Sequence, residues 1–139
     1  MKIEKIDHIG IAVRDIEEAL KLYTDIFNLE IKKIEEFKDL KVKIAFIPVG
    51  EVMLELVQPT STDAPLAKRI RENGEGLYHL ALRVENIDEA IQKMKQSGIE
   101  MRDNEPRLGG MGSKVAFSKP DSTHHVMIEL VERTKELGY

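Results

Sequence analysis

The sequence contains no cysteine among its 139 residues. Disulfide bonds, thiolate nucleophiles and cysteine-based zinc sites are therefore excluded together. If the chain binds a metal ion, histidine and carboxylate side chains must supply the ligands.

Long apolar runs and an excess of basic residues are also missing. No apolar stretch approaches the ~20 residues that cross a bilayer, and the amino-terminal segment MKIEKIDHIG has no apolar signal-peptide core. The 21 basic and 25 acidic residues give a net charge of -4, which argues against a binder of nucleic acid or of a membrane surface. We therefore expect a cytoplasmic protein with neither kind of partner.

What the sequence does contain is an internal repeat. HIGIAVRDIEEAL from His8 matches HLALRVENIDEAI from His79, an offset of 79 − 8 = 71 residues. The same offset pairs KIAF with KVAF, and the hexamer VMLELV returns as VMIELV at an offset of 126 − 52 = 74 residues. One module is written twice, and the 42% hydrophobic content is enough to give it a core.

Each copy predicts a βαβββ module, because a strand-like alternation changes to a helical period and three strand candidates follow. Asp15 and Asn86, each with a glutamate three positions later, predict the helix starts. The expected later strands are 30–36, 41–49 and 52–57, then 100–103, 114–118 and 126–131. We expect an α+β fold in which modules 1–60 and 76–133 form a curved, mostly antiparallel sheet around a metal cavity. Residues 61–75 form a linker with a short helix at 64–72, and 134–139 form a polar tail.

Four polar residues recur on the strands opposite the bulky apolar side chains. Strand side chains alternate between two faces, so a strand packed under a helix should be apolar on one of them. The residues on the other face are His8, Glu55, His79 and Glu129. Two modules arranged about a pseudo-twofold axis would bring two imidazoles and two carboxylates together. This set predicts a divalent-metal site with open positions for water or substrate.

A simpler interpretation exists for each residue alone. A single histidine on a strand is more often structural, and a single glutamate in an apolar strand usually lies on a solvated face. Duplication explains the similar apolar patterns, but two unpaired buried carboxylates would each cost several kcal/mol. A shared cation removes this cost, and the repeat therefore favours the metal site.

With these residues the chain resembles the vicinal oxygen chelate superfamily, whose paired βαβββ modules hold a divalent metal. The stretches ELVQPTSTDAPLAKRI, NGEGLYHLALRVENIDEAI and EPRLGGMGSKVAF are most similar to the methylmalonyl-CoA epimerases. The resemblance covers nearly the whole chain. It implies metal ligands at the same four positions, an acyl-CoA substrate, a homodimer, and cobalt as the first candidate ion before manganese, nickel or zinc.

The resemblance implies metal-dependent epimerisation of methylmalonyl-CoA at C2, with Glu129 in proton transfer. Removal of the C2 proton leaves an enolate, which a divalent cation would stabilise. Some relatives carry a second acid/base glutamate where this chain has Lys43. Lys43, expected on the cavity face, is therefore a candidate second acid/base, beside a water molecule or Glu55. FSKPD also replaces the FLHPK of relatives before the last strand.

Substrate contacts are expected from charged residues and from a glycine-rich segment. Arg83 is a candidate for binding the substrate carboxylate or for pairing with an internal glutamate. The segment GGMGSK would let its amides and Ser113 approach the substrate closely. The candidates for binding the CoA phosphates are Lys68, Arg69, Arg71, Arg107 and Lys114.

Two other functions compete with the epimerase. A glyoxalase I-like enzyme acting on a glutathione hemithioacetal would share the same ligand set, although the stretch PTSTDAPLAK favours the epimerase. A metal-free small-molecule-binding protein of the same fold would typically lack the paired His and Glu. A dioxygenase is disfavoured, because its facial triad uses three protein ligands.

Overall fold

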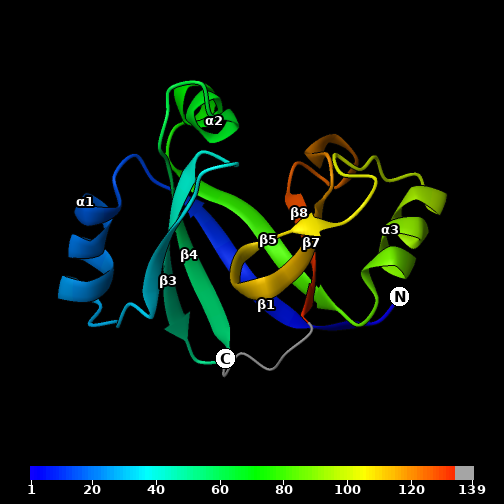
Figure 1. The fold of residues 1–139 in the computed structure, drawn as a ribbon, viewed down its shortest axis with the longest axis horizontal. Helices are drawn as coiled ribbons and strands as arrows, with labels where there is room; N and C mark the ends of the chain where they lie inside the picture. The colour runs from blue at the N-terminus through cyan, green and yellow to red at the C-terminus, as the bar shows by residue number, and fades with distance from the viewer. Residues whose placement is uncertain (134–139) are drawn as a thin grey trace. The chain divides into compact units, whose positions relative to one another are not determined.

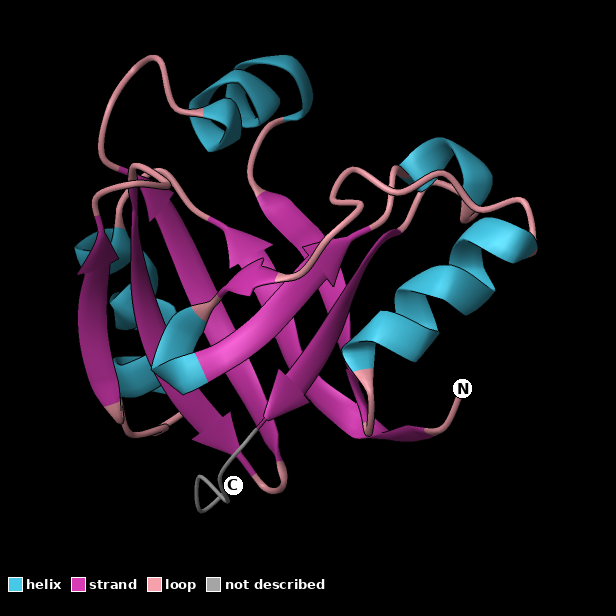
Figure 2. Ribbon diagram, turned by 45° about the vertical axis from the view of Figure 1, so that its right-hand side comes forward, coloured by secondary structure: helices cyan, strands magenta, loops and turns pink. Residues whose placement is uncertain are grey.

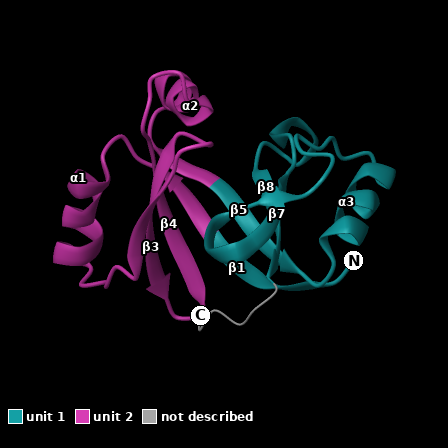
Figure 3. Ribbon diagram, in the orientation of Figure 1, with its two compact units in different colours: residues 1–8, 79–138 teal, residues 9–78, 139 magenta. Residues whose placement is uncertain are grey.

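The computed structural model describes residues 1–133, which cluster into two compact units (Figure 3). Unit 1 contains residues 1–8 and 79 onward, and unit 2 contains residues 9–78. The elements are β1 (Ile3–Ala12), α1 (Ile16–Leu20), the π-helical turn η1 (Lys21–Ile26), β2 (Lys33–Phe37), β3 (Val42–Val49), β4 (Val52–Pro59), α2 (Pro65–Asn73), β5 (Gly76–Val84), α3 (Ile87–Gln96), β6 (Arg107–Leu108), η2 (Gly110–Gly112), β7 (Ser113–Phe117), η3 (Pro120–Ser122) and β8 (Met127–Arg133) (Figure 1).

The order of these elements confirms the predicted α+β fold. The first module runs β1, α1, β2, β3, β4, and the second runs β5, α3, β6, β7, β8. Within the part of the chain that the structure describes, no helix combines the length and apolarity that a membrane crossing requires.

Unit 2 contains the strand order β2-β3-β4-β1, with β3 antiparallel to both β2 and β4. One face of these strands packs against α1, where Ala45, Ile47 and Leu56 meet Val13 and Ile16. The apolar residues of the first repeat therefore pack under its helix, as the alternation predicts.

Helix α2 packs against other residues of the same unit. Its Leu66 and Ile70 form a cluster with Ala12, Val42 and Val57. The last two residues alternate along their strands with those that meet α1, so α2 lies on the opposite face. The predicted helix at 64–72 is confirmed with a shift of one residue.

Unit 1 contains the strand order β5-β8-β7-β6. Strand β8 runs parallel to β5 and antiparallel to β7. Ala116 and Leu130 pack with Ile87 and Ile91 of α3, which lies beside these strands (Figure 2). This unit therefore has the same arrangement, with an apolar strand face under a helix.

Three sequence-based boundaries were wrong. The strand expected at 100–103 is a single bridge between Met101 and Ser118, and β6 lies later in the chain. The first helix is α-helical only to Leu20 and continues as a π-helical turn. Strand β8 ends at Arg133, two residues beyond the expected end at 131, and the tail predicted at 134–139 lies outside the described residues.

Candidate metal centre

The strand register of unit 1 places two predicted ligands on one face. Glu129 of β8 pairs with Ala81 of β5 and with Phe117 of β7. Because β5 alternates, His79 and Arg83 share the face of Ala81 and therefore of Glu129. The opposite face carries the apolar residues that meet α3.

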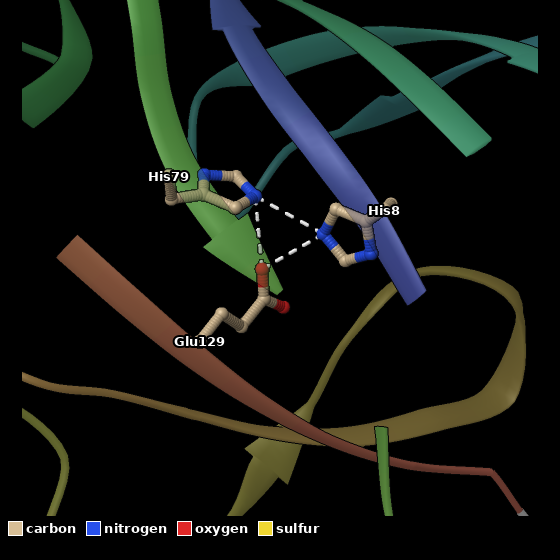
Figure 4. A group of neighbouring side chains, drawn as sticks. All are labelled: His8, His79 and Glu129. Carbon is tan, nitrogen blue, oxygen red and sulfur yellow. Dashed lines mark hydrogen bonds and ion pairs between the residues drawn. The ribbon is translucent and has the colours of Figure 1, made fainter. Parts of the chain in front are cut away.

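His8, His79 and Glu129 meet at one point, and all three are buried (Figure 4). The two Nε2 atoms lie 3.0 Å apart. Glu129 Oε2 lies 2.8 Å from Nε2 of His8 and 2.9 Å from Nε2 of His79. The imidazole rings are nearly perpendicular, at 87°. Three potential ligand atoms thus form a nearly equilateral triangle.

This triangle fits a divalent ion. Ligands held at ~2.1 Å are about 3.0 Å apart across an octahedral edge and about 3.4 Å apart in a tetrahedron. The three observed separations match the octahedral edge. Two ring N–H groups can both donate to Oε2 of Glu129, but this arrangement would bring two donors to within 3.0 Å of each other, whereas a shared cation accounts for all three separations. The two-imidazole, one-carboxylate set suits cobalt, nickel, manganese, zinc or iron.

The charge states of the triad also suit metal binding. Burial acts to raise the pKa of Glu129, but the adjacent His8 and His79 outweigh it and hold that pKa well below its usual range. Burial, together with the nearby charges of His8 and Arg102, lowers the pKa of His79 against the opposing effect of the Glu129 carboxylate. The centre therefore presents an ionised carboxylate and a neutral imidazole, the forms that bind a metal ion.

Behind the triad lies a carboxylate that the sequence reasoning missed. Asp7 Oδ1 accepts a hydrogen bond of 2.7 Å from Nδ1 of His8. Arg83, expected near the substrate, donates from Nε to Asp7 Oδ2 at 2.9 Å. Arg133 also pairs with this carboxylate, at 2.6 Å from Nη2 and 2.9 Å from Nε. Burial acts to raise the pKa of Asp7, but these hydrogen bonds and charges hold it far below its usual range.

Two further predicted residues lie in unit 2. Glu55 is buried on β4, where its partner in β3 is Phe46. Lys43 pairs with Gln58, so alternation places Lys43 on the face of Ala45 and opposite to Glu55. The expectation that Lys43 and Glu55 share a face is therefore wrong. The place of Lys43 in a family pattern does not fix the strand register, and the register decides which face a side chain occupies.

The two predicted substrate-binding residues of β7 point to opposite faces. Ser113 pairs with Arg133 and lies on the face of Glu129, where it is buried and donates to the carbonyl of Gly110 at 2.8 Å. Lys114 pairs with Glu132 on the other face, and the two charges are 3.8 Å apart.

Arg102 is a second residue that the sequence reasoning missed. Its guanidinium carbon lies 4.4 Å from the ring centre of Phe117, and that ring packs edge-on against His79 at 5.4 Å. Among residues 1–133, no carboxylate forms an ion pair with Arg102. The Arg102 guanidinium therefore lies over the Phe117 ring, which in turn contacts the triad residue His79. No sequence signal marked Arg102, because it lies between the matched motifs of the repeat.

The fold and the triad agree with the family to which the chain belongs. The profile of the Glyoxalase/Bleomycin resistance protein/Dioxygenase superfamily matches residues 7–117, which is most of the chain, so the protein is a member of this superfamily.

Similar proteins include both uncharacterised ones and epimerases. The Bacillus subtilis protein YqjC, which is uncharacterised, is 35% identical over 94% of this chain and 93% of its own length. The structure of the hypothetical protein BH1468 from Bacillus halodurans is 39% identical, with a TM-score of 0.93 over 97% of this chain and 98% of its own. A variant of Streptomyces coelicolor methylmalonyl-CoA epimerase, solved with 2-nitronate-propionyl-CoA, is 30% identical, with a TM-score of 0.91 over 96% of both chains.

Proposed function

We propose that this protein is a metal-dependent epimerase that inverts C2 of methylmalonyl-CoA. The observation that carries the proposal is the triangle of His8, His79 and Glu129, in a chain about 30% identical to a methylmalonyl-CoA epimerase over nearly its whole length. Cobalt is the first candidate ion, and manganese, nickel and zinc are alternatives.

A divalent ion at the triad would draw electron density from the substrate carbonyl and so make the C2 proton more acidic. Glu129 then has two tasks. Its Oε2 faces both imidazoles, whereas no hydrogen bond or ion pair within residues 1–133 involves its Oε1. We assign proton abstraction from C2 to Oε1. The second acid/base returns a proton on the other face of C2.

The second acid/base is proposed among Lys43, Glu55 and a water molecule. The strand register argues against Lys43, because that side chain shares the face of Ala45. Glu55 is also proposed as the fourth metal ligand, on the strength of the repeat that pairs its hexamer with that of Glu129. Substitution of each residue decides between these roles.

Arg102 is our candidate for the substrate carboxylate. Arg83, the sequence-based candidate, donates to Asp7, and that ion pair occupies its Nε. Arg102 stacks on Phe117 beside His79 and has no carboxylate partner among residues 1–133. A guanidinium can form two parallel hydrogen bonds with a carboxylate, here that of the substrate.

Arg71 is our candidate for the CoA phosphates. It lines an open pocket of about 520 Å³ together with Arg14 and the hydroxyl residues Thr60, Ser61 and Thr62. Arg71 itself donates from Nη1 to the carbonyl of Thr62 at 2.9 Å, and the other four candidates are not among the residues that line this pocket. Lys68 pairs with Glu72, Arg69 donates to the carbonyls of Gly74 and Leu77, Arg107 pairs with Asp103, and Lys114 pairs with Glu132.

Proton exchange tests this function. The Co²⁺-loaded protein is incubated with methylmalonyl-CoA in deuterated water, and deuterium at C2 is followed by NMR. We expect rapid exchange in the wild type and a loss of at least about 100-fold in Glu129→Gln. Glu132→Gln, the same change three residues along β8, should exchange normally. Absence of exchange in the wild type, with turnover of methylglyoxal hemithioacetal, would instead identify a glyoxalase I-like enzyme.

A further inference from the structure

Asp7 is fully buried, with 0% of its surface exposed, and its carboxylate accepts four hydrogen bonds. One comes from His8, one from Arg83 and two from Arg133. A buried carboxylate is costly unless it is paired and hydrogen-bonded, and two guanidinium groups meet that need here. The two guanidinium groups alone would compensate the negative charge of Asp7, so burial of this carboxylate does not require His8.

His8 nevertheless donates one of these four hydrogen bonds, and the ring nitrogen that it uses decides how the imidazole can act as a ligand. Its Nδ1 contacts Asp7, and its Nε2 faces His79 and Glu129. A neutral imidazole carries a proton on only one nitrogen, and a carboxylate at Nδ1 holds the proton there. The lone pair of Nε2 is then directed at the ligand triangle. A carboxylate in this place also makes the imidazole a more basic ligand.

We propose that Asp7 is a positioning residue of the metal centre, which fixes the tautomer and ring orientation of His8 so that Nε2 ligates the ion. This inference rests on the proposed metal centre but not on the identity of the substrate. Arg133 and Arg83 hold the carboxylate in place, and the Gly110 carbonyl holds Arg133 through a hydrogen bond of 3.1 Å from Nη1. The last residue of β8 thus supports a ligand on β1.

Co²⁺ binding tests the proposal without any acyl-CoA. Protein stripped with a chelator is titrated with Co²⁺, and both the dissociation constant and the visible d–d spectrum are measured. Asp7→Asn should weaken Co²⁺ binding by about 10- to 100-fold and change the spectrum, because loss of such a carboxylate has this effect in other metal sites. Glu132→Gln is the matched control, since its carboxylate accepts from the Ile87 backbone at 3.0 Å and pairs with Lys114. The control should bind Co²⁺ within about twofold of the wild type.

Asp7→Asn leaves two buried arginines without their anion, so folding of the variant is checked by circular dichroism. The double variant Asp7→Asn/Arg133→Gln reduces this charge imbalance and should show the same loss of Co²⁺ affinity. The Zn²⁺-loaded wild type supplies an independent readout by ¹⁵N-edited NMR of the histidine rings, and His8 should show a protected proton on Nδ1.

Two results would overturn the proposal. One is a folded Asp7→Asn protein that binds Co²⁺ as tightly as the wild type. The other is a Zn²⁺-loaded wild type in which His8 carries no proton on Nδ1. A protein that fails to epimerise methylmalonyl-CoA but loses Co²⁺ affinity in Asp7→Asn would refute only the proposed activity. A wild type that binds no Co²⁺ would refute the metal centre itself.

Discussion

At the scale of residues, the candidate centre depends on the alternation of side chains along strands. His79 and Glu129 share one face because β5 and β8 are in parallel register, and the same register directs Leu130 to the core under α3. A shift of one residue in this register would exchange ligand and core positions. The ligands and the packing of unit 1 are thus specified together.

Loss of the Arg102 guanidinium, which pairs with no carboxylate within residues 1–133, should weaken catalysis selectively. Arg102→Met is expected to lower kcat/KM for methylmalonyl-CoA by about 10- to 100-fold, because a hydrogen bond to a charged group contributes about 1.5–3 kcal/mol. Arg107→Met is the control, since Arg107 lies 5.4 Å from the same Phe117 ring but pairs with Asp103. An equal loss in both variants, measured in steady-state assays, would refute a specific role for Arg102.

Lys43→Ala should leave C2 exchange within about twofold of the wild type. The reason is the face of β3 on which Lys43 lies, together with Ala45 and Ile47. Deuterium incorporation under the conditions used for Glu129→Gln measures this. A loss above about tenfold in a folded Lys43→Ala protein would make Lys43 the second acid/base after all.

The sequence could indicate His8, His79 and Glu129 because each lies in a repeated, alternating pattern. Asp7 and Arg133 could not be found in this way, since they lie 126 residues apart and only tertiary contact joins them. The partner of Arg83 was open for the same reason. These three positions were therefore predictable, whereas residues that act through long-range ion pairs were not.

At the scale of elements, the two module helices begin where the sequence places their caps. Asp15 accepts hydrogen bonds from the backbone N–H groups of Glu17 and Glu18, and Asn86 accepts one from Glu89. Capping is a local interaction within one turn, which is why it could be predicted. The π-helical continuation of α1 and the two-residue length of β6 depend on packing and pairing, for which the sequence offers no comparable local signal.

Asn86→Ala should destabilise the protein by about 1 kcal/mol, because it removes the side-chain cap of α3. That helix covers the cluster of Val84 and Leu130. Urea unfolding measures the change, and Co²⁺ affinity of the folded variant should stay at the wild-type value. Asp88→Ala, at a neighbouring first-turn position with no capping hydrogen bond to the backbone among residues 1–133, is the control and should cost clearly less. Equal losses in the two variants would contradict the capping argument.

At the scale of the whole molecule, the internal duplication of a βαβββ module accounts for the fold and for the paired ligands. The βαβββ order occurs twice, and corresponding strands β1 and β5 carry His8 and His79. Superfamily membership follows from the profile match over residues 7–117. Proteins that share a fold can catalyse different reactions, so the proposed activity is inferred from the residues of the site. The expected homodimer stays a prediction, and light scattering of the purified protein tests it.

Metal binding should stabilise the whole chain. At Co²⁺ concentrations 100-fold above the dissociation constant, the native state gains about 2.7 kcal/mol, which raises Tm by roughly 10 °C for a chain of this size. Differential scanning calorimetry with Co²⁺ and with excess chelator measures the shift. His79→Ala should lose it. A shift of the same size in that variant would mean that Co²⁺ binds elsewhere.

The most direct measurement is the anomalous scattering of crystals of the Co²⁺-loaded protein at the cobalt absorption edge. We predict one strong peak per chain, at ~2.1 Å from Nε2 of His8, Nε2 of His79 and Oε2 of Glu129. The same map will show whether Glu55 contacts the ion. A protein that binds Co²⁺ with its peak away from these three atoms, or that gives no peak at all, would contradict the metal centre and the epimerase mechanism built on it.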